Sequence, residues 1–376
     1  KPVSATVVAA GAGGSQHPKS ASSACGTAAA SQLSQRVIDW QRQHGRHTLP
    51  WQRTRDPYRV WLSEIMLQQT QVATVLGYYE RFLQRFPDVQ SLAAAAQDDV
   101  LALWSGLGYY SRARNLHRCA QAVVAEHGGH FPSRSDTLAT LPGIGRSTAA
   151  AIAAFCFGER VAILDGNVKR VLTRVLGFEG DLAMATQERV LWERATALLP
   201  DSGIEAYTQG LMDLGATLCL ARSPQCLLCP VSEGCTAARE GRPERYPVKT
   251  RKLKRGTREH LWLWLRWGER IWLVQRPGSG IWAGLWSLPE IDTADALGEA
   301  SAGWPGDGEA LPSFTHVLTH LDWTLHPRRW TLPAHTTEIR AAQIVAHWPS
   351  GRWFTLDEAL NAGLPAPLRK LLLQPR

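Results

Sequence analysis

The sequence lacks any apolar run approaching the roughly 18 residues that a membrane-spanning helix requires, so it predicts no membrane span. Large apolar residues are almost absent from positions 1–31, which consist mainly of alanine, glycine and serine. Such a segment buries too little surface to offset the entropy lost on ordering, so we expect a disordered tail. It also lacks the continuous apolar core of a secretory signal and the arginines of a transit peptide, which favours the cytoplasm.

The remaining composition is that of an ordinary globular protein, with 44% hydrophobic and 20% charged residues. A chain of 376 residues is long enough for two or more domains, each with its own core. Basic residues exceed acidic ones and give a net charge of +8. This balance indicates an anionic partner, with nucleic acid as the first candidate.

Residues 141–167 contain a turn followed by a helix start that suits an anion. A proline and two glycines interrupt a helical segment and permit a tight, partly left-handed turn. These three residues are Pro142, Gly143 and Gly145. The next helix opens at Arg146 and Ser147, where free N–H groups and the positive end of the helix dipole favour a phosphate. A Gly-x-Gly pair alone is often only the end of a helix.

Two carboxylic acids stand out as candidates for acid–base chemistry. Asp165 occupies the N-cap position of a helix whose apolar face includes Val168, Val171 and Leu172. Glu64 lies among apolar neighbours, and partial burial disfavours the charged form, as a general acid near neutral pH requires. The simpler alternatives are that Asp165 only caps its helix and that Glu64 is solvated or ion-paired.

Four of the seven cysteines are clustered with the spacing Cys-x6-Cys-x2-Cys-x5-Cys, which indicates one metal centre with thiolate ligands. They are Cys219, Cys226, Cys229 and Cys235. Spacing alone slightly favours zinc, and a disulfide pair is the weaker alternative in a cytosolic protein. The other three, Cys25, Cys119 and Cys156, have no evident partner and are expected to be inert thiols.

The chain changes character after position 245. Residues 246–258 form an expected linker, and six of the ten residues from Lys249 to Arg258 are basic, which suits phosphate contact or a solvated tether. Residues 261–265 and 271–274 then predict two strands flanking a turn at Gly268, in a segment rich in tryptophan.

Three motifs together resemble the adenine DNA glycosylases of the MutY type, and the resemblance runs from about Ser34 to the C-terminus. The motifs are Leu62–Val72 (LSEIMLQQTQV), Gly106–Asn115 (GLGYYSRARN) and Leu164–Arg170 (LDGNVKR). The resemblance implies a mainly α, two-lobed helix-hairpin-helix glycosylase core followed by a C-terminal α+β Nudix-like domain. The implied boundaries are 32–245 for the core, 135–157 for the helix-hairpin-helix, 219–235 for an iron–sulfur loop and 259–376 for the Nudix-like domain.

The same resemblance implies a role for individual residues. Glu64 corresponds to the catalytic acid, Asp165 to the group that stabilises the sugar cation, and Asn167 to a residue that holds this aspartate in place. The residues implied to contact DNA are Gln69, Tyr109, Gly143, Gly145, Arg146 and Ser147. The residues implied to form the wall of the adenine pocket are Trp51 and Gln209.

The cofactor and the type of reaction also follow from the resemblance. It implies a [4Fe–4S] cluster on the four clustered cysteines in place of zinc. Related bifunctional glycosylases have a lysine nucleophile where this chain has Ser147, so a monofunctional enzyme is implied. A glycosylase/lyase for oxidised pyrimidines would need that lysine, and a non-catalytic mismatch-binding protein would not need Glu64; both remain as alternatives.

The second half resembles a Nudix-like domain from residues 275–286 onward. The Arg-Glu-x-x-Glu-Glu helix of Nudix hydrolases is missing after Pro289, so pyrophosphate hydrolysis is not expected. In the family this domain reads 8-oxoguanine through a Phe-Ser-His loop, where this chain has Leu318, Thr319 and His320, so we expect Thr319 and His320 to recognise the lesion. The implied partner is duplex DNA with adenine opposite 8-oxoguanine or guanine, bound by a monomeric, nucleoid-associated cytoplasmic enzyme.

Overall fold

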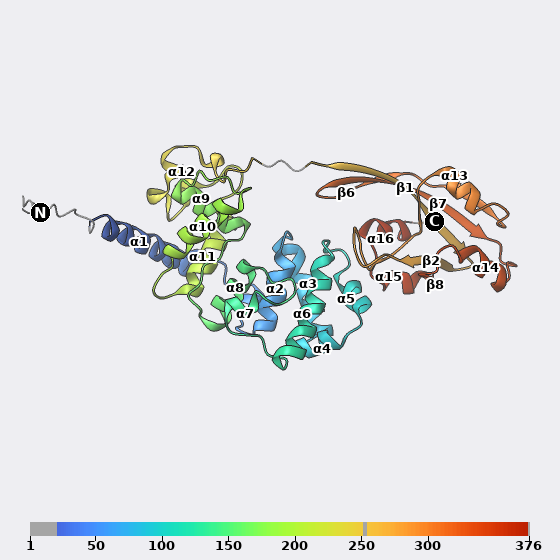
Figure 1. Ribbon diagram of the computed structural model, residues 1–376, viewed down its shortest axis with the longest axis horizontal. Coiled ribbons are helices and arrows are strands. Elements are labelled where there is room, and N and C mark those ends of the chain that lie inside the picture. Colours follow the sequence, from blue (N-terminus) through green and yellow to red (C-terminus); the bar gives the residue numbers. More distant parts are fainter. Residues whose placement is uncertain (1–20, 251–253, 375–376) are drawn as a thin grey trace, which may run out of the picture.

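The computed structural model describes residues 21–250 and 254–374, and Figure 1 shows two helical lobes beside a domain built on a sheet. The first lobe contains α2 (Pro57–Leu67), α3 (Val72–Arg85), α4 (Val89–Ala94), α5 (Gln97–Trp104), α6 (Ser111–His127), α7 (Ser135–Leu138) and α8 (Arg146–Phe157). The second lobe contains α1 (Ala21–His44), α9 (Gly166–Leu176), α10 (Ala185–Ala197), α11 (Ile204–Thr217) and α12 (Thr236–Arg239). Short 3₁₀ helices lie at η1 (Pro50–Gln52), η2 (Cys226–Leu228), η3 (Ser232–Gly234) and η4 (Pro243–Arg245). Within the described residues, no helix combines the length and apolar character needed to cross a bilayer.

Each helical lobe has its own apolar core. Trp61 and Trp104 are fully buried in the first core, while Val37 and Leu214 are fully buried in the second. The second core includes the contact between α1 and α11, where Gly210 allows close approach: a Cβ there would lie 2.7 Å from Val37 Cγ1. The chain enters the first lobe after α1 and returns to the second lobe between α8 and α9, and the residues at both crossings line the cleft between the lobes.

Two expectations about helices are corrected by the structure. Residues 21–31 belong to α1 and are not part of a disordered tail, because alanine, which is frequent there, has the highest helix propensity. Residues 1–20 of the expected tail lie outside the described residues. The sequence also predicts one helix over residues 91–103, whereas the structure divides this segment between α4 and α5, since the backbones of Ala95 and Ala96 are extended between them.

The C-terminal domain consists of a mixed sheet and four helices. Its strands are β1 (Gly256–Trp267), β2 (Arg270–Gln275), β3 (Trp286–Ser287), β4 (Glu290–Ile291), β5 (Asp307–Ala310), β6 (Phe314–Val317), β7 (Leu321–Leu332) and β8 (Gly351–Thr355). Its helices are α13 (Ala294–Ala300), α14 (Glu338–Val345), α15 (Leu356–Leu360) and α16 (Ala366–Leu372). The strand order is β3-β2-β1-β7-β5, with β1 and β7 parallel; β4 pairs with β1, β6 with β7 and β8 with β2.

Alternation along β1 explains why both faces of this sheet are covered. Leu263 and Leu265 point into a core shared with α13 and α14, whereas Trp262 and Trp264 belong to the core on the side of α15 and α16. The two strands expected around Gly268 are confirmed as β1 and β2, although β1 begins at Gly256, inside the expected linker. The expected fold class, a helix-hairpin-helix core with a Nudix-like domain, is confirmed.

The C-terminal domain packs directly on the first lobe at α5 and α6, as Figure 1 shows. Trp286 Nε1 and Gln275 Nε2 both donate to the carboxylate of Asp98, at 3.3 and 3.0 Å. Tyr110 Oη and Ser105 Oγ both donate to the Leu364 carbonyl, at 3.1 and 3.0 Å. Buried apolar side chains run continuously from the first lobe into this domain. The two parts therefore share one interface, built from apolar contacts and satisfied polar groups.

Candidate active site and nucleic-acid interface

A cleft of about 1100 Å³ lies between the two helical lobes and contains most of the expected catalytic residues. Helix α2 forms one wall, and α9 and α11 form the other. The expected site residues that line it are Trp51, Glu64, Gln69, Ser147, Asp165, Asn167 and Gln209. Trp51 and Gln209, which are 158 positions apart in the chain, therefore line the same cleft.

Glu64 is held in its protonated form by its surroundings. It lies on α2 between buried Ser63 and Ile65, and its own side chain is only partly open to the cleft. Burial, together with the nearby charge of Asp165, raises the pKa of Glu64 to about 8. A carboxylic acid that retains its proton near neutral pH suits the transfer of that proton to a leaving group.

The Asp165 side chain caps the start of α9. Its carboxylate accepts a hydrogen bond from the Val168 backbone N–H at 2.7 Å, which confirms the expected N-cap. Burial raises the pKa of Asp165, but the backbone N–H groups of Val168 and Asn167 and the charges of Arg170 and Lys169 lower it. Hydrogen-bond donors and cations thus favour the anion at Asp165, whereas nothing comparable opposes burial at Glu64.

Asn167 acts on Asp165 through its backbone. Its N–H group is one of the donors that favour the Asp165 carboxylate, while its side-chain oxygen accepts from Arg170 Nη2 at 2.9 Å. Gly215 on α11 lies so close that an added Cβ would stand 2.6 Å from Asn167 Cβ. The start of α9 is therefore fixed against α11, which keeps Asp165 in place.

The hairpin before α8 matches the expected turn at one glycine and not at the other. Gly143 has φ +75°, and an added Cβ would lie 2.6 Å from Asn115 Cβ, so this position requires glycine. Gly145 has φ −81° and serves as the N-cap of α8, so it is not left-handed. Gly145 and Arg146 are exposed beside the helix start, which leaves the N–H groups there open to a phosphate.

Arg146 and Ser147 have different partners at the start of α8. The guanidinium of Arg146 lies 3.9 Å above the ring of Trp192 on α10, which fixes the direction of this exposed cation. Ser147 Oγ accepts a hydrogen bond from the Leu164 N–H at 3.0 Å, and so ties α8 to the residue before Asp165. The hydroxyl of Ser147 is thus used inside the protein, next to the cleft that it lines.

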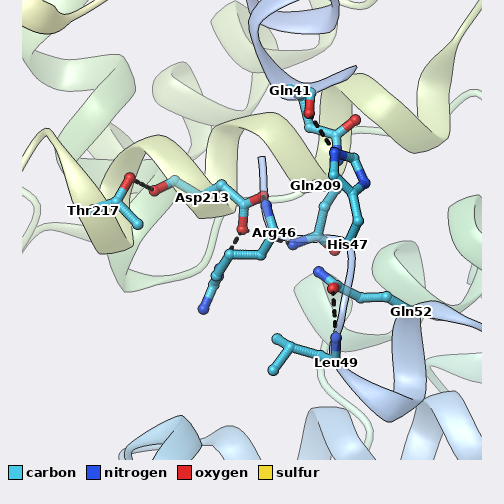
Figure 2. Close-up of polar contacts among 8 residues, drawn as sticks. All are labelled: Gln41, Arg46, His47, Leu49, Gln52, Gln209, Asp213 and Thr217. Carbon is cyan, nitrogen blue, oxygen red and sulfur yellow. Dashed lines mark hydrogen bonds and ion pairs between the residues drawn. The ribbon is translucent and has the colours of Figure 1, made fainter. Parts of the chain in front are cut away.

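The far end of the cleft contains a polar cluster that sequence reasoning found only in part (Figure 2). Gln209 Nε2 donates to Asp213 Oδ1 at 2.9 Å, and Arg46 donates to the same carboxylate from its backbone N–H at 2.9 Å and from Nε at 2.7 Å. Asp213 has no exposed side-chain surface. Its spacing of four residues from Gln209 on one helix was the available signal. Trp51, the other expected wall residue, packs edge-on against Tyr79.

Gln69 and Tyr109 lie side by side on two different turns, and Gln69 also lines the edge of the cleft. Both line a smaller pocket of about 240 Å³ together with Gly143. Gln69 has φ +57° and Tyr109 has φ +47°, although neither is glycine. Both are exposed, and 44% of the surface of Tyr109 is accessible. Arg112, which the sequence analysis did not single out, is buried beneath them.

The expected lesion-reading residues lie in the turn between β6 and β7, next to this pair. Thr319 Oγ1 and Tyr109 Oη are 2.9 Å apart, so the C-terminal domain touches the exposed side chain of Tyr109. Thr319 and His320 are exposed, and Leu318 is partly buried against the apolar core. Gln69, Tyr109 and Thr319 thus form one surface, with the cleft on one side of it.

The four clustered cysteines line a single pocket between α9, α11 and α12. Buried Arg174 donates to Cys219 Sγ at 3.3 Å and to the carbonyls of Leu220 and Pro243, which holds the loop on α9. Among the residues that the structure describes, no three His, Cys, Asp or Glu side chains converge closely enough for a single ion. Four thiols around one pocket are a donor set that fits a metal centre held by thiolates.

The other cysteines behave as expected where the structure describes them. Cys119 is fully buried on α6, and Cys156 is half-buried on α8. Burial raises the pKa of each thiol to about 12, so both remain protonated and unreactive at neutral pH. The side chain of Cys25 lies outside the described residues.

Family models match both parts of the chain. Residues 62–194 match the HhH-GPD superfamily of base excision DNA repair proteins, and residues 261–374 match the NUDIX domain. A solved structure of a thermostable thymine-DNA glycosylase superposes with a TM-score of 0.51 and 27% sequence identity, covering 57% of this chain and 98% of that one. Fold and site together define a helix-hairpin-helix base excision repair protein that carries a C-terminal NUDIX domain.

Full-length relatives narrow this class further. The adenine DNA glycosylase of Buchnera aphidicola subsp. Schizaphis graminum is 34% identical over 344 residues, which cover 90% of this chain and 97% of that protein. The adenine DNA glycosylase of Homo sapiens is 32% identical over 401 residues, which cover 89% of this chain and 72% of that protein. The chain belongs to the adenine DNA glycosylase family, and the resemblance seen in the sequence is confirmed.

Proposed function

We propose that the protein hydrolyses the N-glycosidic bond of adenine paired with 8-oxoguanine or guanine in duplex DNA. The observation that supports this best is the pairing of Glu64, whose pKa is about 8, with Asp165 across one cleft. An acid that keeps its proton and a carboxylate whose charge neighbouring N–H groups and cations support provide the two functions that glycoside cleavage needs. The cleft is large enough for an extruded nucleotide, as flipping the base out of the duplex requires.

The reaction would proceed from proton transfer to loss of the base. The Glu64 carboxyl protonates a ring nitrogen of the purine, N7 by family resemblance, so that the base leaves with the bonding electron pair. Positive charge then develops on the sugar, and the Asp165 carboxylate offsets it. Water adds to the sugar carbon and leaves an abasic site, while the proton it releases returns to the acid–base pair.

The polar cluster at the far end of the cleft supports an amino-purine as the base. An amide whose N–H is committed to Asp213 offers its carbonyl oxygen to a ligand, so Gln209 suits an exocyclic amino group. Trp51 would then form the apolar wall of the pocket. We propose these roles for Gln209 and Trp51 together with the one for Asn167 described above.

The enzyme is proposed to be monofunctional. A Schiff base needs an amine, and the residue at the lysine position of bifunctional relatives is Ser147, whose hydroxyl accepts from Leu164. Gly143, Gly145 and Arg146 would bind the DNA backbone at the start of α8, while Gln69 and Tyr109 would enter the base stack. Thr319 and His320 would contact the base opposite the adenine.

The proposed cofactor is a [4Fe–4S] cluster held by Cys219, Cys226, Cys229 and Cys235. Their shared pocket and the hydrogen bond from Arg174 to Cys219 fit such a centre. When bound, the cluster cross-links a loop that has only short 3₁₀ turns of its own, and so contributes folding free energy. The residues around it would present the loop to DNA as a rigid unit.

The test is an excision assay on duplexes that differ only in the base opposite one adenine. The purified protein is incubated with adenine opposite 8-oxoguanine, guanine or thymine, and each product is divided into alkali-treated and untreated halves. We expect cleavage at the adenine only after alkali, in the order 8-oxoguanine, guanine and then thymine. Absence of alkali-labile product on every duplex would overturn the proposal, and strand nicking without alkali would overturn the monofunctional assignment.

A further inference from the structure

Two exposed residues of the DNA-facing surface have a backbone conformation that is unusual for their type. Gln69 and Tyr109 both lie in the left-handed region, with φ +57° and +47°. A Cβ atom is crowded by the backbone in this region, so such residues persist only where surrounding contacts hold them. Each follows a turn of its own, one after α2 and the other before α6. The contacts that hold both turns come from one side chain.

The first turn is held by the guanidinium of Arg112. Helix α2 ends at Leu67, and its last carbonyls have no partner within the helix. Arg112 Nη1 donates to three carbonyls here, those of Ile65 at 2.9 Å, Met66 at 2.8 Å and Gln68 at 2.6 Å. Gln68 directly precedes Gln69, so this nitrogen fixes the orientation of the peptide bond between Gln68 and the left-handed Gln69.

The second turn is held by the other nitrogen of the same group. Arg112 Nη2 donates to the carbonyls of Leu107 at 3.1 Å and Gly108 at 3.2 Å, and Gly108 directly precedes Tyr109. It also donates to Thr70 Oγ1 at 3.1 Å, on the far side of Gln69. The guanidinium carbon lies 5.5 Å from the ring centroid of Tyr109, so the fork supports this ring as well.

A planar fork is required for this arrangement. Arg112 is only 8% exposed, and its six hydrogen bonds are made to carbonyl and hydroxyl oxygens on two separate turns. Lysine carries the same charge but places its three donors on one atom, which cannot reach two sets of carbonyls in opposite directions. Arg112→Lys therefore preserves charge while removing the link between the turns.

We propose that Arg112 is the positioning residue that presets Gln69 and Tyr109 as a rigid pair for insertion into the duplex. This inference rests on the proposed function, since it concerns how the mispair is opened before the chemistry in the cleft. Arg112 does not line the cleft that contains Glu64. It does line the 240 Å³ pocket between the two side chains, where it supports both from beneath. Because Gln69 and Tyr109 are already ordered in the free protein, their conformational entropy is lost on folding and not on DNA binding, which favours unstacking of the duplex.

Unstacking is measured with 2-aminopurine beside the target adenine, in a duplex with 8-oxoguanine opposite. All proteins carry Glu64→Gln so that no base is removed, and fluorescence is read at saturating protein, where affinity no longer matters. We expect the background protein to raise the signal and Arg112→Lys to reduce that rise at least threefold. Arg85→Lys, an exposed arginine on α3 paired with Asp99, is the matched control and should leave the rise unchanged. An equal rise with Arg112→Lys would overturn the proposal.

A second measurement separates positioning from a general loss of structure. With Glu64 intact, Arg112→Lys should slow single-turnover excision at least tenfold on the stacked mispair. The loss should be much smaller when abasic-site analogues flank the adenine and stacking is already absent. Equal losses on both duplexes would mean that Arg112 is only structural. If Arg112→Lys does not fold, Thr70→Val removes one of the six bonds and must show the same imbalance. Failure of the proposed function would appear separately, as no excision by the unmodified protein on either duplex.

Discussion

Glu64 illustrates how the position of a single residue determines its chemistry. Its ordinary pKa near 4.5 is raised to about 8, chiefly because burial penalises the charged form. The folded state therefore binds a proton between these two pH values that the unfolded chain has already released. Stability contributed by this group falls as pH rises through that range, which is the reverse of an ion-paired carboxylate.

Glu64→Gln should consequently stabilise the protein at alkaline pH. The amide has nearly the same shape and does not titrate, so the variant gains relative to the original as pH rises from about 4.5 to about 8. We expect a gain of about 1–2 kcal/mol at pH 8.5, less than the full linkage value because the side chain borders an open cleft. Denaturant unfolding at pH 5 and pH 8.5 measures it, and a difference that is larger at pH 5 would contradict the sign.

Ser147 provides a second test at the residue scale. Ser147→Ala removes the acceptor of the Leu164 N–H, which should cost about 1 kcal/mol of stability and slow excision less than tenfold. Ser147→Lys places an amine beside the cleft, and borohydride should then trap a covalent adduct that the original protein does not form. A trapped adduct with the unmodified chain would contradict the monofunctional assignment.

At the scale of elements, the loop that carries the four clustered cysteines depends on Arg174. Its guanidinium is 2% exposed and donates to Cys219 Sγ and to carbonyls on both sides of the loop. Arg174→Met should cost about 3–5 kcal/mol of stability, because buried carbonyls lose their donors, and metal should be retained poorly. Elemental analysis should return about four irons per chain for the unmodified protein. One zinc per chain, or full metal content in Arg174→Met, would contradict this account.

The elements that could be predicted from the sequence are those with strong local signals. Asp165 before an amphipathic helix, Pro142 with Gly143, and the strands around Gly268 all appear where the pattern indicates them. The apolar spacing over residues 61–86, which predicts helix with possible breaks, could not show that Gln69 is left-handed, because a distant guanidinium imposes that conformation. Asp213 was missed for the same reason: its partner Arg46 lies 167 positions away.

The whole molecule is held together by the interface between the first lobe and the sheet domain. Sequence patterns gave no indication of this contact, because Asp98 and Leu364 resemble ordinary surface and core residues until the domains meet. Deleting the chain from Gly256 onward would expose buried Leu101, which lies beside Gly284 and Gly363, so truncation should destabilise the helical core as well. Point variants in the turn between β6 and β7 are therefore the better test of lesion reading.

His320→Ala should erode discrimination between the two opposite bases. If its imidazole makes one hydrogen bond to a base edge, the ratio of the excision rate opposite 8-oxoguanine to the rate opposite guanine should fall. The expected fall is equivalent to roughly 1–2 kcal/mol. Thr319→Val, which removes the hydroxyl beside Tyr109, should lower the same ratio. Exposed His335 provides the matched control, and His335→Ala should leave the ratio unchanged. An unchanged ratio for both Thr319→Val and His320→Ala would mean that the C-terminal domain stabilises the fold and does not read the base opposite the adenine.

The most direct test of the central claim is single-turnover excision of adenine opposite 8-oxoguanine by the original protein and by Glu64→Gln, from pH 6 to pH 10. Because the acid form of Glu64 is lost above its pKa of about 8, the original rate should be level below that pH and fall about tenfold per unit above it. Glu64→Gln should bind the duplex within about tenfold of the original and excise at least about a thousandfold more slowly. Excision by Glu64→Gln at a near-original rate, or an original rate that rises with pH, would contradict the assignment of Glu64 as the proton donor.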